Sequence, residues 1–300
     1  MPVDVRWTEA YAGSLFKWQD TLEAVEIGLT DLGWVGILWE GSKLPLQNAT
    51  YALPFVTDDL PALLNLWNDL HEQIPELNEA WDVRNQVFLG STGVETYHLL
   101  TNFPIRTLDD LKGRKILAPG SAALWLQGTG AIAVDGALTT FYTQMQTGVA
   151  DGVLSIVTAA YPYRLYEVAP HITLVGLGAQ VNGALAINKK TFNRLPVEVQ
   201  GILRRLGRDY SDYVAKDMVA RYENAVEVMT EEGAHISELP LDEKQRWIDG
   251  LPEMGQQWVE RNERKGLPAR RVLDAFMNGV RGYGDTPLRA WDEFSEDGGS

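Results

Sequence analysis

The sequence predicts an α/β fold, and two patterns support this prediction. Strand-like and helix-like segments alternate over residues 1–190, which is typical of α/β proteins with largely parallel sheets. Apolar residues then recur at helical spacing from residue 196 to residue 232 without a break. A helix of that length would be about 55 Å long at about 1.5 Å per residue, so we expect it to span two lobes.

The expected elements of the first hundred residues are short. Residues 3–7 predict a strand, and residues 22–28 predict a helix that ends at a glycine, the usual left-handed cap. Residues 32–39 are apolar and contain several glycines, which predicts a buried strand that runs into a loop. Further on, the pattern predicts a helix over residues 61–71 and strands over residues 87–92 and 97–100.

The second half of the chain is dominated by the long helix. Pro196 suits its first turn and Gly233 suits its end. The alternative is two helices joined near Gly207. After the long helix we expect a strand over residues 235–239, helices over residues 242–264 and 269–280, and a frayed polar tail at residues 296–300.

Composition excludes several classes of function. A net charge of −15 argues against nucleic acid, which needs clustered cations, and against an anionic membrane surface. The absence of cysteine excludes disulfides, thiolate metal sites and thiol nucleophiles. No apolar run approaches the roughly 20 residues that a membrane span requires, so we expect no direct insertion into a membrane.

No catalytic or metal-binding motif is recognisable. The four histidines, His71, His98, His171 and His235, do not share a helix at i and i+4, and we interpret each as an ordinary surface or rim residue. Nucleophile-elbow, dinucleotide and nucleotide-phosphate motifs are all missing. We therefore expect no cofactor, no metal and no enzyme, but a binding module.

Ten tryptophans offer flat apolar walls, and their rings can also hold cations. Trp34 and Trp39 flank Gly36 at the expected end of a strand, which is where open α/β sheets bind ligands. Core filling is the alternative interpretation of these two residues.

Two segments together resemble a known family. Residues 107–121 read TLDDLKGRKILAPGS, which predicts a short helix, a turn, a strand and a new helix start; residues 141–153 read FYTQMQTGVADGV. The pair resembles the central signature of the extracytoplasmic substrate-binding proteins of TRAP transporters, the DctP-like family. Weaker matches in the same order occur at residues 23–33, 44–45, 53–55, 166–168 and 186–196.

The resemblance implies a two-lobe, periplasmic-binding-protein-like fold of type II, with a long helix crossing both lobes. Residues 1–94 and 184–300 would form the first lobe, including the connecting helix 196–232 and the C-terminal helices, and residues 95–183 would form the second. Family members usually begin with a secretion signal, a strand and a helix. We therefore expect the N-terminal strand and helix to be missing here, and a periplasmic location.

The resemblance also implies where a ligand would bind. The family usually has an arginine in the pattern DLKG-x-K-I-R-x-P-G-S, and this arginine clamps the ligand's carboxylate; here that position is Leu117. Ser155 stands at the family's asparagine position, Thr140 where a side chain commonly packs on the ligand, and Tyr97 on the hinge-side strand. The expected site residues are Trp34, Trp39, Glu40, Tyr97, Leu117, Trp125, Thr140, Ser155 and Gln180.

We therefore expect a monomeric solute-binding subunit of a TRAP-type secondary transporter, which delivers a small organic solute to the large and small membrane subunits. Without the clamp arginine, the ligand should not be a simple dicarboxylate. It could be an aromatic or amphipathic organic acid, or a cationic or zwitterionic solute caged by Trp34, Trp39 and Tyr97. The alternatives are a ligand sensor without a transporter, or an enzyme on the same fold that uses Glu40 or Glu95 as a carboxylate of perturbed pKa.

Overall fold

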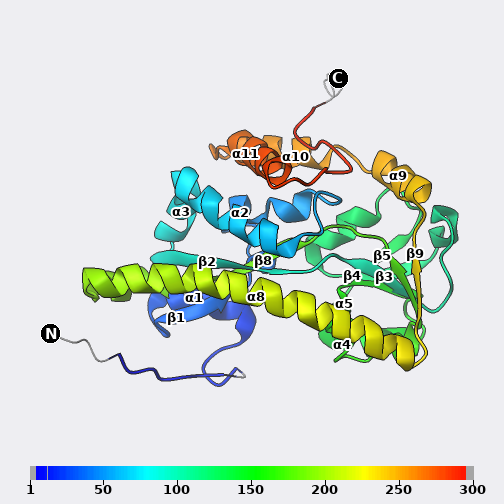
Figure 1. Cartoon of the computed structure of the whole chain (residues 1–300), viewed down its shortest axis with the longest axis horizontal. Coiled ribbons are helices and arrows are strands. Elements are labelled where there is room, and N and C mark those ends of the chain that lie inside the picture. The colour runs from blue at the N-terminus through cyan, green and yellow to red at the C-terminus, as the bar shows by residue number, and fades with distance from the viewer. Residues whose placement is uncertain (1–4, 12, 295–300) are drawn as a thin grey trace.

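The computed structural model describes residues 5–11 and 13–294 of the chain, which form two β-sheets flanked by helices (Figure 1). One sheet has three strands in the order β1-β8-β2, and the other has six in the order β5-β4-β6-β3-β7-β9. In Figure 1, α8 (Val197–Glu231) extends along the whole length of the molecule past both sheets. Stacked above the small sheet are α2 (Leu60–Gln73), α3 (Pro75–Asp82), α10 (Met254–Glu263) and α11 (Ala269–Gly282).

The small sheet consists of β1 (Leu32–Val35), β8 (Gln180–Asn188) and β2 (Gln86–Val94), and both of its strand pairs are antiparallel. The expectation of largely parallel sheets was therefore wrong here. The chain leaves the small sheet along β2 and returns along β8, so these neighbouring strands run in opposite directions. The expected buried strand at β1 is only partly buried, since only Val35 of its four residues is buried.

The large sheet is mixed. Its strands are β3 (His98–Thr101), β4 (Lys115–Ala118), β5 (Ile132–Asp135), β6 (Gly152–Ser155), β7 (His171–Leu174) and β9 (His235–Glu238). β4 pairs in parallel with β5 and β6, and β7 pairs in parallel with β9, whereas β3 is antiparallel to β6 and β7. β9 joins this sheet although it follows α8 in the chain.

The predicted long helix is confirmed as one unbroken element, α8 (Val197–Glu231), of 35 residues. Gly207 does not interrupt it. Instead, Gly207 lies where α8 crosses β2, and a Cβ atom added there would stand 2.2 Å from the carbonyl oxygen of Leu89. Glycine at this point allows the two backbones to touch.

The helices predicted over residues 22–28, 61–71 and 269–280 are present, and two other predicted elements need correction. The α-helices are α1 (Thr21–Ile27), α2 (Leu60–Gln73), α3 (Pro75–Asp82), α4 (Leu138–Gln146), α5 (Val157–Ala160), α6 (Leu165–Val168), α7 (Lys189–Arg194), α9 (Leu241–Gly250), α10 (Met254–Glu263) and α11 (Ala269–Gly282). The short 3₁₀ helices are η1 (Trp18–Asp20), η2 (Ile37–Trp39), η3 (Pro45–Asn48), η4 (Thr50–Ala52), η5 (Leu108–Leu111) and η6 (Gly120–Leu126).

The first correction concerns residues 242–264, which form two helices rather than one. Leu251 between α9 and α10 is extended, with φ −73° and ψ 140°. Pro252 follows it, and proline disfavours a helical conformation in the preceding residue and lacks an N–H to continue the helix. The second correction concerns residues 5–7, which have no regular structure. The rest of that predicted strand and the polar tail at 296–300 lie outside the described residues.

The large sheet has an apolar core on each of its two faces, because successive side chains of a strand point in opposite directions. On β4, Ile116 and Ala118 belong to the main core, which continues into the small sheet and helices α2, α10 and α11. Leu117 between them belongs to a second core with Phe141 of α4 and Val153 of β6. None of the helices in the described residues is long and apolar enough to cross a membrane.

Candidate functional site

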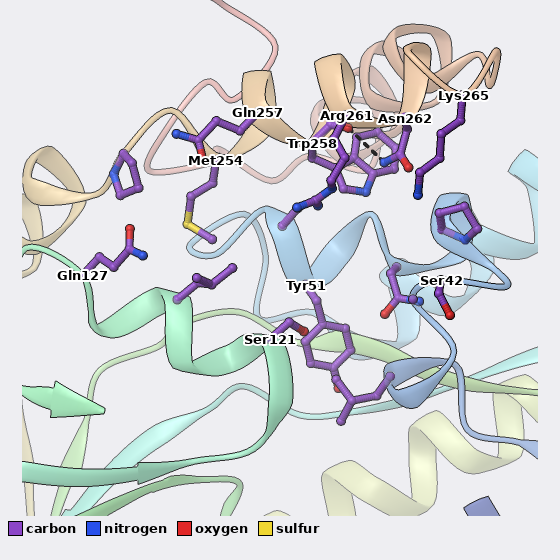
Figure 2. Close-up of a pocket in the computed structure, with 17 residues that line it drawn as sticks. Ser42, Tyr51, Ser121, Gln127, Met254, Gln257, Trp258, Arg261, Asn262 and Lys265 are labelled. Carbon is purple, nitrogen blue, oxygen red and sulfur yellow. Dashed lines mark hydrogen bonds between the residues drawn. The ribbon is translucent and has the colours of Figure 1, made fainter. Parts of the chain in front are cut away.

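A cavity of about 370 Å³ lies where three parts of the chain meet. One side is formed by η2 to η4, the segment that follows β1 of the small sheet, and another by η6, which follows β4 of the large sheet. Helix α10 and the turn after it close the third side (Figure 2). The cavity therefore lies between segments that emerge from the two different sheets, and its volume is in the range of small-molecule sites.

Buried aromatic rings form the base of this region. Tyr51 of η4 is stacked on Trp125 of η6, with ring centres 5.8 Å apart, and Tyr97 meets the Trp125 ring edge-on at 5.2 Å. The Trp125 indole Nε1–H also donates to the Tyr51 carbonyl oxygen at 2.9 Å. Because η4 and η6 follow strands of different sheets, this aromatic contact links the two halves of the molecule at the cavity.

Burial keeps the phenols of this cluster neutral. The hydroxyl groups of Tyr51 and Tyr97 lie 3.4 Å apart. Desolvation raises the pKa of Tyr97 to about 12, and it raises the pKa of Tyr51 well above its usual value. Both phenols are therefore protonated at neutral pH. The cluster is a neutral wall with hydrogen-bonding capacity.

All three sides of the cavity contribute polar lining residues. Ser121 Oγ and Asn262 Oδ1 are buried atoms without a hydrogen-bond partner, and such atoms are uncommon in folded proteins. Asn262 is held in place because its Nδ2 donates to the Trp258 carbonyl oxygen at 2.9 Å. The charged lining side chains are Arg261 and Lys265, and the lining includes no Asp or Glu.

Leu117, the residue at the clamp-arginine position, does not line this cavity. Its side chain is fully buried in the second core, packed towards Phe141 and Gly136 beneath α4. β4 therefore presents an apolar side chain to the protein interior at the point where the family pattern has a cation.

The expected tryptophan cage is divided between two aromatic groups. Trp34 and Trp39 gather around Trp18, with ring-centre distances of 6.3 Å and 4.2 Å, and Trp34 Nε1 donates to Thr92 Oγ1 at 2.7 Å. Tyr97 belongs to the group with Tyr51 and Trp125, and among the described residues its ring contacts neither Trp34 nor Trp39. Trp39 is 46% exposed.

The other predicted site residues lie outside the cavity lining. Ser155 is buried at the end of β6, opposite His98, and its Oγ donates to the Ile156 carbonyl oxygen at 3.3 Å. Gln180 is buried on β8 and its Oε1 has no hydrogen-bond partner. Thr140 is exposed and bonds the Ala137 carbonyl oxygen at the start of α4.

The two carboxylates of the enzyme alternative have structural partners. Glu40 is buried and forms an ion pair with Lys43 at 3.3 Å. Glu95 accepts hydrogen bonds from the backbone N–H and the hydroxyl of Thr158, at 2.7 and 3.0 Å. Burial raises the pKa of Glu95, but its bonds tie the start of α5 to the connection between β2 and β3.

His98 and His71 are buried, so the prediction that every histidine is a surface or rim residue was wrong for these two, and His98 contacts the long helix. Its Nδ1 accepts from the backbone N–H groups of Val175 and Gly176, at 3.2 and 3.3 Å, so the proton resides on Nε2. That nitrogen lies 3.4 Å from the hydroxyl of Tyr222 on α8. Burial lowers the pKa of His98 to about 3, so the ring is neutral. Within the described residues, no three His, Cys, Asp or Glu side chains are grouped to hold a metal.

Sequence reasoning missed the contribution of α10 to the cavity. Met254, Trp258 and Arg261 line it and are spaced at i, i+4 and i+7, which places them on one face of the helix. Lys265 also lines it, from the turn that follows α10. This spacing was available in the sequence. What it could not indicate was that this face closes over η4 and η6.

Comparison with known proteins agrees with this architecture. The sequence model of the family described as "Bacterial extracellular solute-binding protein, family 7" (DctP) matches residues 6–262. The chain is 24% identical over 272 residues to the C4-dicarboxylate-binding periplasmic protein DctP of Rhodobacter capsulatus, covering 89% of this chain and 80% of that protein. It is 31% identical over 180 residues to a solute-binding protein of Sulfitobacter sp. strain NAS-14.1, covering 56% of this chain and 53% of that protein. The chain thus spans about half the length of the Sulfitobacter relative.

Solved structures show the same fold. A TRAP periplasmic solute-binding protein from Desulfovibrio salexigens aligns with a TM-score of 0.80 at 22% identity, covering 95% of this chain and 88% of that one. One from Bordetella bronchiseptica, with bound (R)- and (S)-mandelate, aligns with a TM-score of 0.75 at 22% identity, covering 90% and 86%. These likenesses confirm the predicted two-lobe α/β fold. Given the family match over residues 6–262, the chain belongs to family 7 of the bacterial extracellular solute-binding proteins, the DctP family.

Proposed function

We propose that this chain is the solute-binding subunit of a TRAP-type transporter, and that it captures an organic acid with an apolar body. The family membership supports the transport role. The cavity between η4, η6 and α10 supports solute capture at the junction of the two lobes. In the periplasm, the loaded protein would then present its solute to the large and small membrane subunits.

The observation that carries the ligand class is the buried position of Leu117 on β4. A small dicarboxylate has two charged ends and little apolar surface, so it needs cations more than it needs apolar walls. Beside its two cations, the cavity offers Tyr51, Met254 and Trp258 as apolar or aromatic lining, which suits an acid with an apolar body. Related structures hold ligands of varied shape: β-D-galacturonate in the Sulfitobacter protein, mandelate in the Bordetella bronchiseptica protein and pyroglutamate in a marine metagenome protein.

The arrangement of the elements supports a hinge mechanism. Residues 1–94 with 184–300 and residues 95–183 would be the two lobes, joined by β2, β8 and α8. A solute that binds both lobes stabilises the closed form over the open form, which shifts the population towards the form that the membrane subunits recognise.

A thermal-shift panel tests the ligand class. The purified chain is heated with (R)-mandelate, pyroglutamate, galacturonate, ectoine, succinate or malate in turn. A ligand at 100 times its Kd stabilises the folded state by about 2.7 kcal/mol, which is readily measured as a shift in Tm. We expect a shift with (R)-mandelate or pyroglutamate and none with succinate or malate. Stabilisation by succinate or malate alone would overturn the proposed ligand class.

The transport role has a separate test. Deletion of the gene should abolish uptake of the stabilising acid by cells of the source organism, and the genes for a large and a small membrane subunit should stand beside it. Normal uptake after deletion would favour the alternative of a ligand sensor without a transporter.

A further inference from the structure

We propose that Arg261 and Lys265 bind the carboxylate of the solute, so that the anion anchor of this protein stands on α10 rather than on β4. The inference rests on the proposed function, because it names the group that recognises the acid in the same cavity. It extends that function by assigning the residues that determine specificity and the part of the ligand that each one recognises.

The first support is the direction of the two side chains. Arg261 lies on α10 and Lys265 lies in the turn that follows it, and both line the cavity. Figure 2 shows both side chains pointing from this segment towards the space above Tyr51 and Ser42. They approach the cavity from the side opposite η6.

The second support is the charge of the lining. The chain has 41 acidic and 26 basic residues, yet the lining of this cavity contains two cations and no carboxylate. Among the described residues, neither Arg261 nor Lys265 forms an ion pair. By contrast, neighbouring cations are paired: Arg270 contacts Asp274 at 2.8 Å and Arg289 contacts Glu253 at 2.8 Å. In an acidic protein, such a local excess of positive charge attracts an anion.

The third support is the pair of buried polar atoms without partners. Asn262 is 1% exposed and its Oδ1 can only accept a hydrogen bond, whereas Ser121 Oγ can donate or accept. A carboxylate can satisfy Ser121 Oγ together with the two cations. A hydroxyl group on the ligand can donate to Asn262 Oδ1. Burying these atoms unpaired is costly, so a ligand that pairs them gains affinity.

These groups define a ligand class: a hydroxylated organic monocarboxylate with an apolar or ring-shaped body. The carboxylate would face Arg261 and Lys265, the hydroxyl would face Asn262, and the body would lie against Tyr51 and Trp258. A ligand with a second carboxylate would place that charge against this apolar wall without a partner, which disfavours it.

The test compares two neutralising substitutions with a charge-matched control. The titrated probes are (R)-mandelate, β-D-galacturonate and mandelamide, the uncharged analogue of mandelate. The variants are Arg261→Gln and Lys265→Gln, and the control is Arg264→Gln, which removes the same charge from the same end of α10 but does not line the cavity. Because all three side chains are exposed, the variants should keep the Tm of the wild type.

We expect Arg261→Gln and Lys265→Gln each to raise the Kd for the bound acid about tenfold or more, which is the usual effect of losing a charged hydrogen bond. Arg264→Gln should change the Kd less than about twofold, and mandelamide should be insensitive to all three substitutions. Unchanged acid binding by both neutralising variants would overturn the inference and leave the proposed function intact.

Two further outcomes separate the inference from the function. If the wild type binds mandelamide as tightly as mandelate and does not bind galacturonate, recognition of a carboxylate here is overturned, although solute binding stands. If the wild type binds none of these probes and none of the six solutes in the thermal-shift panel, both the inference and the proposed ligand class fail.

Discussion

The crossing of α8 over β2 makes an unusual prediction about two glycines in the same helix. Replacing glycine by alanine inside a helix normally stabilises it by about 0.8–1 kcal/mol, because alanine loses less backbone entropy on folding. At Gly201, an added Cβ atom meets nothing closer than Arg205 Nη1 at 3.7 Å. Gly201→Ala should therefore raise the free energy of unfolding by roughly 0.4–1 kcal/mol.

At Gly207 the same substitution should have the opposite sign. Its Cβ atom would stand 2.2 Å from the Leu89 carbonyl oxygen and 2.5 Å from the Leu89 carbonyl carbon, and real Cβ atoms essentially never approach other atoms within 3.0 Å. These neighbours are backbone atoms of β2, so the helix and the strand must separate by the better part of an ångström. Overpacking of this kind costs about 1–3 kcal/mol, which exceeds the gain in helix propensity.

Equilibrium urea unfolding of the two single variants and the wild type measures this difference. We expect Gly207→Ala to be less stable than Gly201→Ala by about 2 kcal/mol or more. Gly90→Ala on the facing strand should be destabilised as well, because its Cβ atom would lie 2.1 Å from the Gly207 carbonyl oxygen. If Gly207→Ala stabilises the protein as much as Gly201→Ala does, the described contact between α8 and β2 is refuted.

Two further predictions concern buried side chains. Burial lowers the pKa of His71 from 6.5 to about 4. As the pH falls from about 6.5 towards 4, His71 therefore takes up a proton in the unfolded chain but not in the folded protein. The folded protein loses stability over this pH range. Between pH 7 and pH 5 the loss in the free energy of unfolding amounts to ~2 kcal/mol. The variant His71→Phe can keep the ring stack on Phe88, and urea unfolding should show that it loses correspondingly less stability over that pH range. An equal loss in the wild type and the variant would contradict a neutral, buried His71. Trp125→Phe removes the hydrogen bond to the Tyr51 carbonyl oxygen and should cost about 1–3 kcal/mol of stability. Trp39→Phe changes a half-exposed side chain and should cost less than about 1 kcal/mol. Equal melting temperatures for the two variants would argue against the buried aromatic base formed by Tyr51, Tyr97 and Trp125.

Local patterns predicted those parts of the fold that local forces determine. The apolar repeat from residue 196 to 232 identified α8 as a helix, because its spacing matches the helical period. It did not identify the buried face: Leu206 and Tyr213 are exposed, whereas the buried residues of α8 are Gly207, Ser211, Ala215, Ala225 and Met229. The signature around Leu117 identified the family because it combines a strand, a turn and a helix start at fixed spacing. The antiparallel direction of the strands in the small sheet was not predictable from local patterns. It follows from the path of the chain, which leaves this sheet along β2 and returns to it along β8.

The candidate site was predicted less completely, for a physical reason. A ligand cavity is formed by segments far apart in the chain, here η2 to η4, η6 and α10. The sequence indicated that Leu117 could not act as a clamp, but it could not show where another cation would stand. Trp34, Trp39 and Tyr97 were expected to form a cage around the ligand, yet tertiary packing places Tyr97 in a different aromatic group from the two tryptophans.

A crystal structure of this protein with a bound organic acid tests the account most directly. The protein is crystallised with the acid that gives the largest shift in Tm, and the position of the carboxylate is read from the electron density. The account predicts the carboxylate within hydrogen-bonding distance, about 2.7–3.2 Å, of the Arg261 guanidinium or the Lys265 ammonium group. A carboxylate bound elsewhere, with Arg261 and Lys265 facing solvent, would contradict it.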